Sequence, residues 1–198
     1  SGGTWDGKRT AVIAAAECGQ GVELLIRSDS DYSGDPQYLE LGHCEKFNGM
    51  RSTLPVPLQT WTHVAVTVTS GGVISYFING EPAGSWNASE RSIAPEHLRL
   101  GTAIRLGNNS AQRQFDGRLD EVLILSQAMD PATIKNSYNL NLLGTEFPFV
   151  FALYSFDEGP GDQTLDRAPG GGFAHGNLLG GPLWVQSGAS PSVVITAE

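Results

Sequence analysis

Hydrophobic and polar residues alternate with a period near two along much of the chain, as they do in half-buried strands. The alternation is clear in Tyr38-Leu39-Glu40-Leu41, and the run from Thr62 to Thr69 is rich in β-branched residues. The strand that follows ends at Asn79-Gly80, a pair that favours a two-residue hairpin turn. We expect the other strands over 11–17, 22–28, 73–78, 98–101 and 119–125.

One segment has the pattern of a helix. Asp130 is a good N-cap, Pro131 suits the first helical position, and residues 132–138 complete about two turns. Many short strands, frequent glycine turns and one short helix are typical of an antiparallel sandwich or jelly roll. A doubly wound α/β fold would need alternating helices, and the pattern lacks them.

Composition and charge exclude several classes of protein. The 198 residues are 40% hydrophobic, which is enough for a core, and the length suits one domain or two small ones. No stretch approaches the roughly 20 apolar residues that a membrane-spanning helix needs. The net charge is −9 without a basic stripe, so we expect no nucleic-acid partner and no membrane insertion.

A family resemblance is carried by residues between Thr60 and Asn139. It rests on five signals in a fixed order, which are Trp61–Val66, Ile78-Asn79-Gly80, Leu98–Gly101, Phe115–Val122 and the helix after Asp130-Pro131. In this order they resemble the laminin G-like, concanavalin A-like jelly-roll modules. The resemblance implies an all-β fold, a two-sheet antiparallel β-sandwich with one short helix.

The opening motif of such modules occurs late in this sequence. Three segments carry this resemblance: Leu153–Gly159 resembles the first strand, Asp166–Gly172 resembles the Asp and glycine-rich turn that follow it, and His175-Gly176 resembles the pair before the next strand. We expect residues 149–198 to complete the same sandwich as the main body, 1–145, in one domain over 1–198. Two alternatives stay open: the chain holds the back of one repeat and the front of another, or two chains exchange residues 149–198 in a strand-swapped dimer.

No pattern for catalysis is present, so we predict a protein that is not an enzyme. Some glycoside hydrolases share this sandwich, but they need a pair of carboxylates flanking the scissile bond. The sequence has no run of alternating carboxylates on one strand, and its adjacent Asp120 and Glu121 would point to opposite faces. The four histidines are scattered, and we interpret each as a strand or turn residue: His43, His63, His97 and His175.

Calcium is the metal that the sequence favours. The family resemblance implies that Asp157 of the first strand and Asp120 of the closing strand lie close together at a structural calcium ion. The alternative is that both carboxylates accept hydrogen bonds from loop amides. A second acidic loop, Asp29 to Gly34 followed by Glu40, has the spacing of an EF-hand, but Pro36 and the flanking strands favour an acidic turn.

The two cysteines, Cys18 and Cys44, follow predicted strands that end at the same edge of a meander. We therefore predict a disulfide between them, with two free thiols as the alternative. A disulfide implies an oxidising compartment, so we expect an extracellular, periplasmic or cell-surface location.

Exposed aromatic side chains are the usual platforms for sugar rings, and the candidates are Trp5, Tyr32, Tyr38, Trp86 and Trp184. We select Tyr32, Trp86 and Asn108 as ligand-binding residues, and Asn108 also begins a glycosylation pattern. The sequence thus predicts a non-catalytic recognition module that binds a glycan or an extracellular protein. A structural or assembly spacer is the alternative, and a glycan-cleaving enzyme is a third hypothesis.

Overall fold

The structure is a computed structural model that divides into two compact units. Unit 1 comprises Ser1–Thr60 and Ala83–Arg118, and unit 2 comprises Trp61–Pro82 and Leu119–Glu198. The structure describes residues 9–15, 22–28, 36–42, 50–88, 98–101, 103–104, 111–112, 115–140, 147, 149–169, 175–185 and 193–197. Among these residues no helix is long and apolar enough to cross a membrane.

Unit 1 contains a four-stranded sheet with the order β3-β2-β1-β7. The predicted meander forms, because β1 pairs with β2 and β2 with β3 in antiparallel register, and β7 pairs with the free edge of β1. The strands are β1 (Arg9–Ala15), β2 (Val22–Ser28), β3 (Gln37–Gly42) and β7 (Leu98–Leu100). Two further short strands, β8 (Ala103–Ile104) and β9 (Ala111–Gln112), pair with each other.

Strand β3 is buried on both faces from Leu39 to Gly42. The alternation in the sequence predicts one polar face, yet Glu40 is only 1% exposed. Its Oε2 accepts a hydrogen bond from Nη1 of Arg27 at 2.8 Å, which compensates part of the cost of burying the carboxylate. The backbone of residues 51–56 runs beside β3, with isolated bridges Gln37↔Val56 and Glu40↔Arg51.

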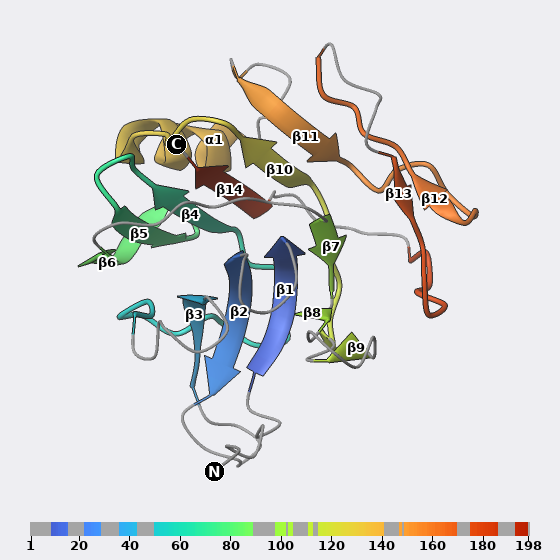
Figure 1. The fold of residues 1–198 in the computed structure, drawn as a ribbon, viewed down its shortest axis with the longest axis horizontal. Coiled ribbons are helices and arrows are strands. Elements are labelled where there is room, and N and C mark those ends of the chain that lie inside the picture. Colours follow the sequence, from blue (N-terminus) through green and yellow to red (C-terminus); the bar gives the residue numbers. More distant parts are fainter. Residues whose placement is uncertain are drawn as a thin grey trace. The chain divides into compact units, whose positions relative to one another are not determined.

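The six-stranded sheet has the order β11-β10-β14-β4-β5-β6, which Figure 1 shows with β14 between β10 and β4. Its strand β14 is parallel to both neighbours, whereas β4–β5 and β10–β11 are antiparallel. The strands are β4 (Val64–Val68), β5 (Val73–Ile78), β6 (Glu81–Asn87), β10 (Val122–Leu125), β11 (Val150–Tyr154) and β14 (Val193–Ala197). A two-stranded sheet pairs β12 (Gln163–Thr164) with β13 (Gly176–Asn177).

The core of unit 2 follows one row of residues across five strands. Adjacent strands place these residues opposite one another, in the order Phe77, Ala65, Val194, Leu123 and Leu153. Four of them belong to one buried cluster with Leu125 and Ile134: Phe77, Ala65, Leu123 and Leu153. Ile134 comes from the helix α1 (Pro131–Leu140), so the helix covers the sheet along this row.

Helix α1 begins as the sequence predicts. Asp130 caps it, because its Oδ1 accepts a hydrogen bond from the Thr133 backbone N–H at 3.0 Å and its Oδ2 accepts one from the Thr133 hydroxyl at 2.6 Å. These bonds lower the pKa of Asp130. The predicted hairpin turn also forms, since Asn79 and Gly80 have φ values of 51° and 75° between β5 and β6.

Several elements differ from the prediction. The strand expected from residue 119 begins at Val122, because Glu121 has a left-handed φ of 48° that ends the extended backbone. Strands β6, β8 and β9 were not predicted, since β8 and β9 are too short for a hydrophobic period, whereas β12, β13 and β14 lie within residues 149–198, where strands were expected without individual bounds. The parallel pairing of β14 departs from an all-antiparallel sandwich, while the mostly β fold with one described helix is confirmed. That the whole chain forms one domain stays a prediction.

A change of pH should act on His63, whose side chain is fully buried against the Tyr138 ring, with the two ring centroids 5.5 Å apart. Neither ring nitrogen has a hydrogen-bond partner in the described residues, and burial lowers the pKa of His63 to about 4. The unfolded chain takes up a proton below its ordinary pKa of 6.5, so about 3 kcal/mol of stability should be lost as the pH falls toward 4.

The variant His63→Leu removes this titration and should flatten the loss of stability between pH 7 and pH 4.5, as measured by urea unfolding. An equally steep acid loss in His63→Leu would show that another group is responsible.

A second prediction concerns the close contact between the hairpin turn and α1. A Cβ atom on Gly80 would lie 3.0 Å from Tyr138 Cδ1 and 3.3 Å from Lys135 Cα, whereas one on Gly159 would meet nothing within 4 Å. The two glycines have nearly the same left-handed φ, +75° for Gly80 and +77° for Gly159. Gly159→Ala should cost about 1 kcal/mol through its backbone alone. Gly80→Ala should cost at least twice that in urea unfolding, and equal losses would mean that the turn does not press on the helix.

Candidate functional site

The candidate site begins where residues 51–54 pack on β6. The Thr53 backbone N–H donates to the Ala83 carbonyl at 2.6 Å, and the Thr53 hydroxyl donates to the same oxygen at 3.1 Å. This close approach requires glycine at position 84, because a Cβ there would lie 3.0 Å from Thr53 N and its φ is +118°. The hydrogen bonds and the glycine therefore hold the segment firmly against β6.

Trp86 lies at the same place, with 40% of its surface exposed. Its indole N–H donates to the Arg51 carbonyl at 2.7 Å, so the polar atom of the ring is satisfied by the protein itself. An exposed indole fixed in this way presents an apolar face without losing further side-chain freedom when a ligand binds. Leu54 and Leu58, which follow Arg51 in the chain, are also exposed, at 49% and 45%.

Arg51 connects Trp86 to a second aromatic residue. Its guanidinium carbon lies 4.4 Å from the centroid of the Tyr38 ring, in the geometry of a cation–π contact. Tyr38 is half-buried on β3, whereas the Arg51 backbone bonds Trp86 of β6. We call Tyr38, Arg51 and Trp86 the aromatic platform. It combines an apolar ring surface with a planar charged donor, which suits a ligand with both C–H faces and hydroxyl groups.

The platform joins two of the five aromatic candidates, Tyr38 and Trp86, with a residue that the sequence analysis missed. Arg51 has no sequence signal, because it lies in a polar stretch and its role depends on β3 and β6 coming together. Trp184 is half-buried, and its indole N–H donates to the Gly161 carbonyl at 3.0 Å. Outside the described residues lie Trp5, Tyr32, Asn108, Cys18, Cys44 and the acidic loop from Asp29; the predictions made for them stay predictions.

Unit 2 contains a group of acidic side chains around the start of β10. Burial raises the pKa of Glu121 to about 7, and the negative charges of Asp120 and Asp157 add to this effect, while Arg167 opposes it. Oε2 of Glu121 is buried and has no hydrogen-bond partner in the described residues. The predicted pair, Asp120 and Asp157, thus lies near a third carboxylate, Glu121, which the sequence analysis had considered only as a catalytic partner of Asp120.

This acidic group was tested as a calcium site. Carboxylate oxygens are suitable ligands, and the unpaired Oε2 of Glu121 fits a missing cation or proton. Within the described part of the chain, however, no three His, Cys, Asp or Glu side chains are arranged to hold a metal ion. The residue types therefore suit calcium, but these side chains are not arranged as a coordination shell. A calcium ion at this place stays a prediction.

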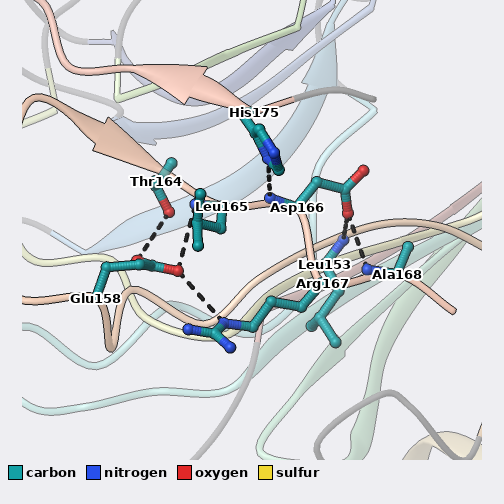
Figure 2. Close-up of polar contacts among 8 residues, drawn as sticks. All are labelled: Leu153, Glu158, Thr164, Leu165, Asp166, Arg167, Ala168 and His175. Atoms are coloured by element: carbon teal, nitrogen blue, oxygen red, sulfur yellow. Dashed lines mark hydrogen bonds and ion pairs between the residues drawn. The ribbon is translucent and has the colours of Figure 1, made fainter. Parts of the chain in front are cut away.

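The motif after β11 forms a hydrogen-bond network that Figure 2 shows in close-up. Oδ1 of the buried Asp166 accepts hydrogen bonds from the Leu153 and Ala168 backbone N–H groups, each at 3.0 Å. The Asp166 N–H in turn donates to Nδ1 of His175 at 3.1 Å. Leu153, Asp166 and His175 therefore have a structural role, because their hydrogen bonds connect β11 to the segments around residues 166 and 175.

Glu158 holds the other side of the same network. Its Oε1 accepts from the Leu165 N–H and from Nε of Arg167, both at 3.3 Å, and its Oε2 accepts from the Thr164 hydroxyl at 3.3 Å. The turn that carries Asp157 is thereby fixed beside β11.

Comparisons with known proteins agree with this architecture. The family model described as the concanavalin A-like lectin/glucanases superfamily matches residues 4–135. The chain is a laminin G-like member of that superfamily. The match covers β1 to β10, and in this laminin G-like module the strands β11 and β14 lie beyond it. No curated protein matches the chain.

Two solved structures are similar to this laminin G-like chain. A Bacteroides ovatus protein with a proposed carbohydrate-binding role has a TM-score of 0.61 and 20% identity, over 81% of this chain and 45% of that one. This chain thus spans less than half of that protein. A heptameric SAP-like pentraxin from Limulus polyphemus has a TM-score of 0.49 and 15% identity, over 87% of this chain and 77% of that one. At such identities the likeness of the first concerns the fold alone.

Glu121 gives a testable pH dependence. Its folded pKa of about 7 exceeds the ordinary 4.5, so the folded protein keeps a proton that the unfolded chain has lost. The resulting stability is complete below about pH 4.5 and disappears as the pH rises through 7. Glu121→Gln imitates the protonated form, so its thermal midpoint should exceed the parent's at pH 8 and match it at pH 4.5.

The exposed Asp162 of the same unit is the control, and Asp162→Asn should follow the parent at both pH values. Midpoints of Glu121→Gln and the parent that coincide at pH 8 would contradict the raised pKa. The negative charge of the acidic group can be neutralised by a proton on Glu121 or by a bound cation. Calcium added at pH 8 distinguishes the two, since a bound ion would raise the thermal midpoint of the parent and leave that of Glu121→Gln unchanged.

Proposed function

We propose that this laminin G-like module binds a glycan without cleaving it, and that the sugar stacks on Trp86. The observation that carries the proposal is an indole that is 40% exposed yet held by its own N–H bond to Arg51. Sugar rings have apolar C–H faces and hydroxyl edges, which correspond to the indole face and to the nearby Arg51 guanidinium. The superfamily includes lectins by its description, and the Bacteroides ovatus protein has a proposed carbohydrate-binding role.

We further propose that the module belongs to a secreted or cell-surface protein and that calcium, where bound, is structural. Asp120 and Asp157 would hold the ion, and its charge would relieve their repulsion with the nearby Glu121. Tyr32 and Asn108 remain proposed ligand residues, and the Cys18–Cys44 disulfide remains proposed. An extracellular protein as the ligand, or a spacer role, is the alternative to a glycan.

One observation favours the glycan-cleaving hypothesis instead. A carboxyl group with a pKa raised to about 7 beside other carboxylates is the usual arrangement of a general acid in glycosidases. Release of reducing ends from a polysaccharide by the parent, abolished in Glu121→Gln and intact in Asp162→Asn, would establish cleavage and refute the non-catalytic proposal.

The binding proposal is tested with Trp86→Ala and a panel of soluble β-glucan, xylan, mannan, starch and mucin glycans. Isothermal titration should find one class that binds the parent and loses roughly tenfold or more affinity for Trp86→Ala. Trp184→Ala is the matched control, because its indole also bonds a backbone carbonyl, in unit 2, and should leave the affinity unchanged. Equal affinity of Trp86→Ala and the parent would remove the platform from the site, and no binding to any glycan would favour a protein ligand or a spacer.

A further inference from the structure

The position between β4 and β10 in the sheet is occupied by β14, a strand that lies outside the residues matched by the family model. Strands β4 and β10 lie within the matched residues 4–135, whereas β14 comprises Val193–Ala197. Its register places Val194 opposite both Ala65 of β4 and Leu123 of β10. Ala65 and Leu123 are 0% and 1% exposed, so the gap lies in the buried core. We call this position between β4 and β10 the strand-acceptor slot. The strand that occupies it pairs with four residues of β4 and four residues of β10.

The neighbouring strand β11 is held with strained backbone at both of its ends. Phe149, just before it, has a φ of 67°, and Phe156, two residues after it, has a φ of 57°. A left-handed backbone is costly for any side chain larger than glycine and is an outlier for bulky residues. Strain in the hinge that joins a segment to its own chain favours exchange of that segment with another chain, and Phe149 lies at such a junction before β11.

The same region exposes much apolar surface. Of the nine large hydrophobic side chains that are exposed in the described residues, six fall between 149 and 185: Phe149, Phe151, Leu165, Leu179, Leu183 and Val185. Phe151 is 63% exposed and Leu183 is 86% exposed. Large apolar side chains gathered in one segment of the chain are candidates for contact with another protein. The residues 149–197, which we call the arm, therefore bury Leu153 and Tyr154 in the sheet but leave these six side chains exposed.

We propose that the strand-acceptor slot is filled in trans, by β14 of a second copy of this chain, in an arm-exchanged dimer. The occupant is a second copy because the slot already accepts this strand sequence in a defined parallel register. Exchange keeps every backbone pairing of β11 and β14 and releases the strain at Phe149, where the arm leaves the main body, whereas Phe156 lies inside the arm and keeps its conformation. This inference concerns assembly and is independent of the proposed glycan site in unit 1.

The full chain tests the proposal by sedimentation equilibrium from micromolar to millimolar concentration, followed by NMR on a sample of mixed isotopes. When half of the copies carry 15N and half 13C, filtered cross-peaks between Ile195 and Val66 arise only between different copies. We expect a dimer that shows these cross-peaks. A monomer at every concentration overturns the proposal, and so does a dimer without the cross-peaks, because its copies would associate through the apolar surface alone.

Two variants of one position isolate the contribution of strain. Phe149→Ala and Phe149→Gly both remove the aromatic ring and keep the carbonyl that accepts the Ser126 N–H, but only glycine tolerates the φ of 67°. Glycine at position 149 removes the backbone strain of the closed monomer and therefore stabilises the monomer relative to the dimer. The dimer of Phe149→Gly should be about tenfold weaker than that of Phe149→Ala. Equal dimerisation constants for the two variants would contradict exchange at this strand end.

Discussion

Two buried strands, β4 and β10, depend on a third for the hydrogen bonds of their facing edges. Strand β14 supplies those bonds, and the row that it completes carries the core of unit 2 from Phe77 through Ala65 and Leu123 to Leu153. Backbone groups buried without partners are costly, so this row cannot stay open in a stable sheet. The hydrogen bonds of Asp166 and Glu158 help to fix the start of the segment that leads to β14.

Recognition and stability are assigned to different parts of the laminin G-like chain. The aromatic platform lies in unit 1, where Gly84 lets residues 51–54 approach β6 and the indole N–H of Trp86 is used to fix the ring. The acidic group of Asp120, Glu121 and Asp157 lies in unit 2, where burial and like charges act on Glu121. One part therefore presents a preformed apolar face, while the other contains a carboxyl group whose pKa is raised.

The sequence predicted what depends on local chemistry and failed where distant segments meet. The Asp130 cap, the Asn79-Gly80 turn and the strand over Val73–Ile78 follow from a few neighbouring residues, and the structure confirms them. The parallel position of β14 could not be predicted, since an apolar strand of five residues carries no signal of its direction or neighbours. Arg51 and Glu121 were missed for a related reason, because a cation–π contact and a raised pKa arise only after folding brings other groups close.

The central claim is that a glycan stacks on the indole of Trp86. Its most direct test is a two-dimensional NMR titration of the folded chain that follows the indole N–H resonances during addition of the glycan. The account predicts a progressive, saturable shift of the Trp86 indole resonance, while the Trp184 indole, bonded to Gly161 in the other unit, keeps its position. Saturable binding that leaves the Trp86 resonance unmoved would contradict the account.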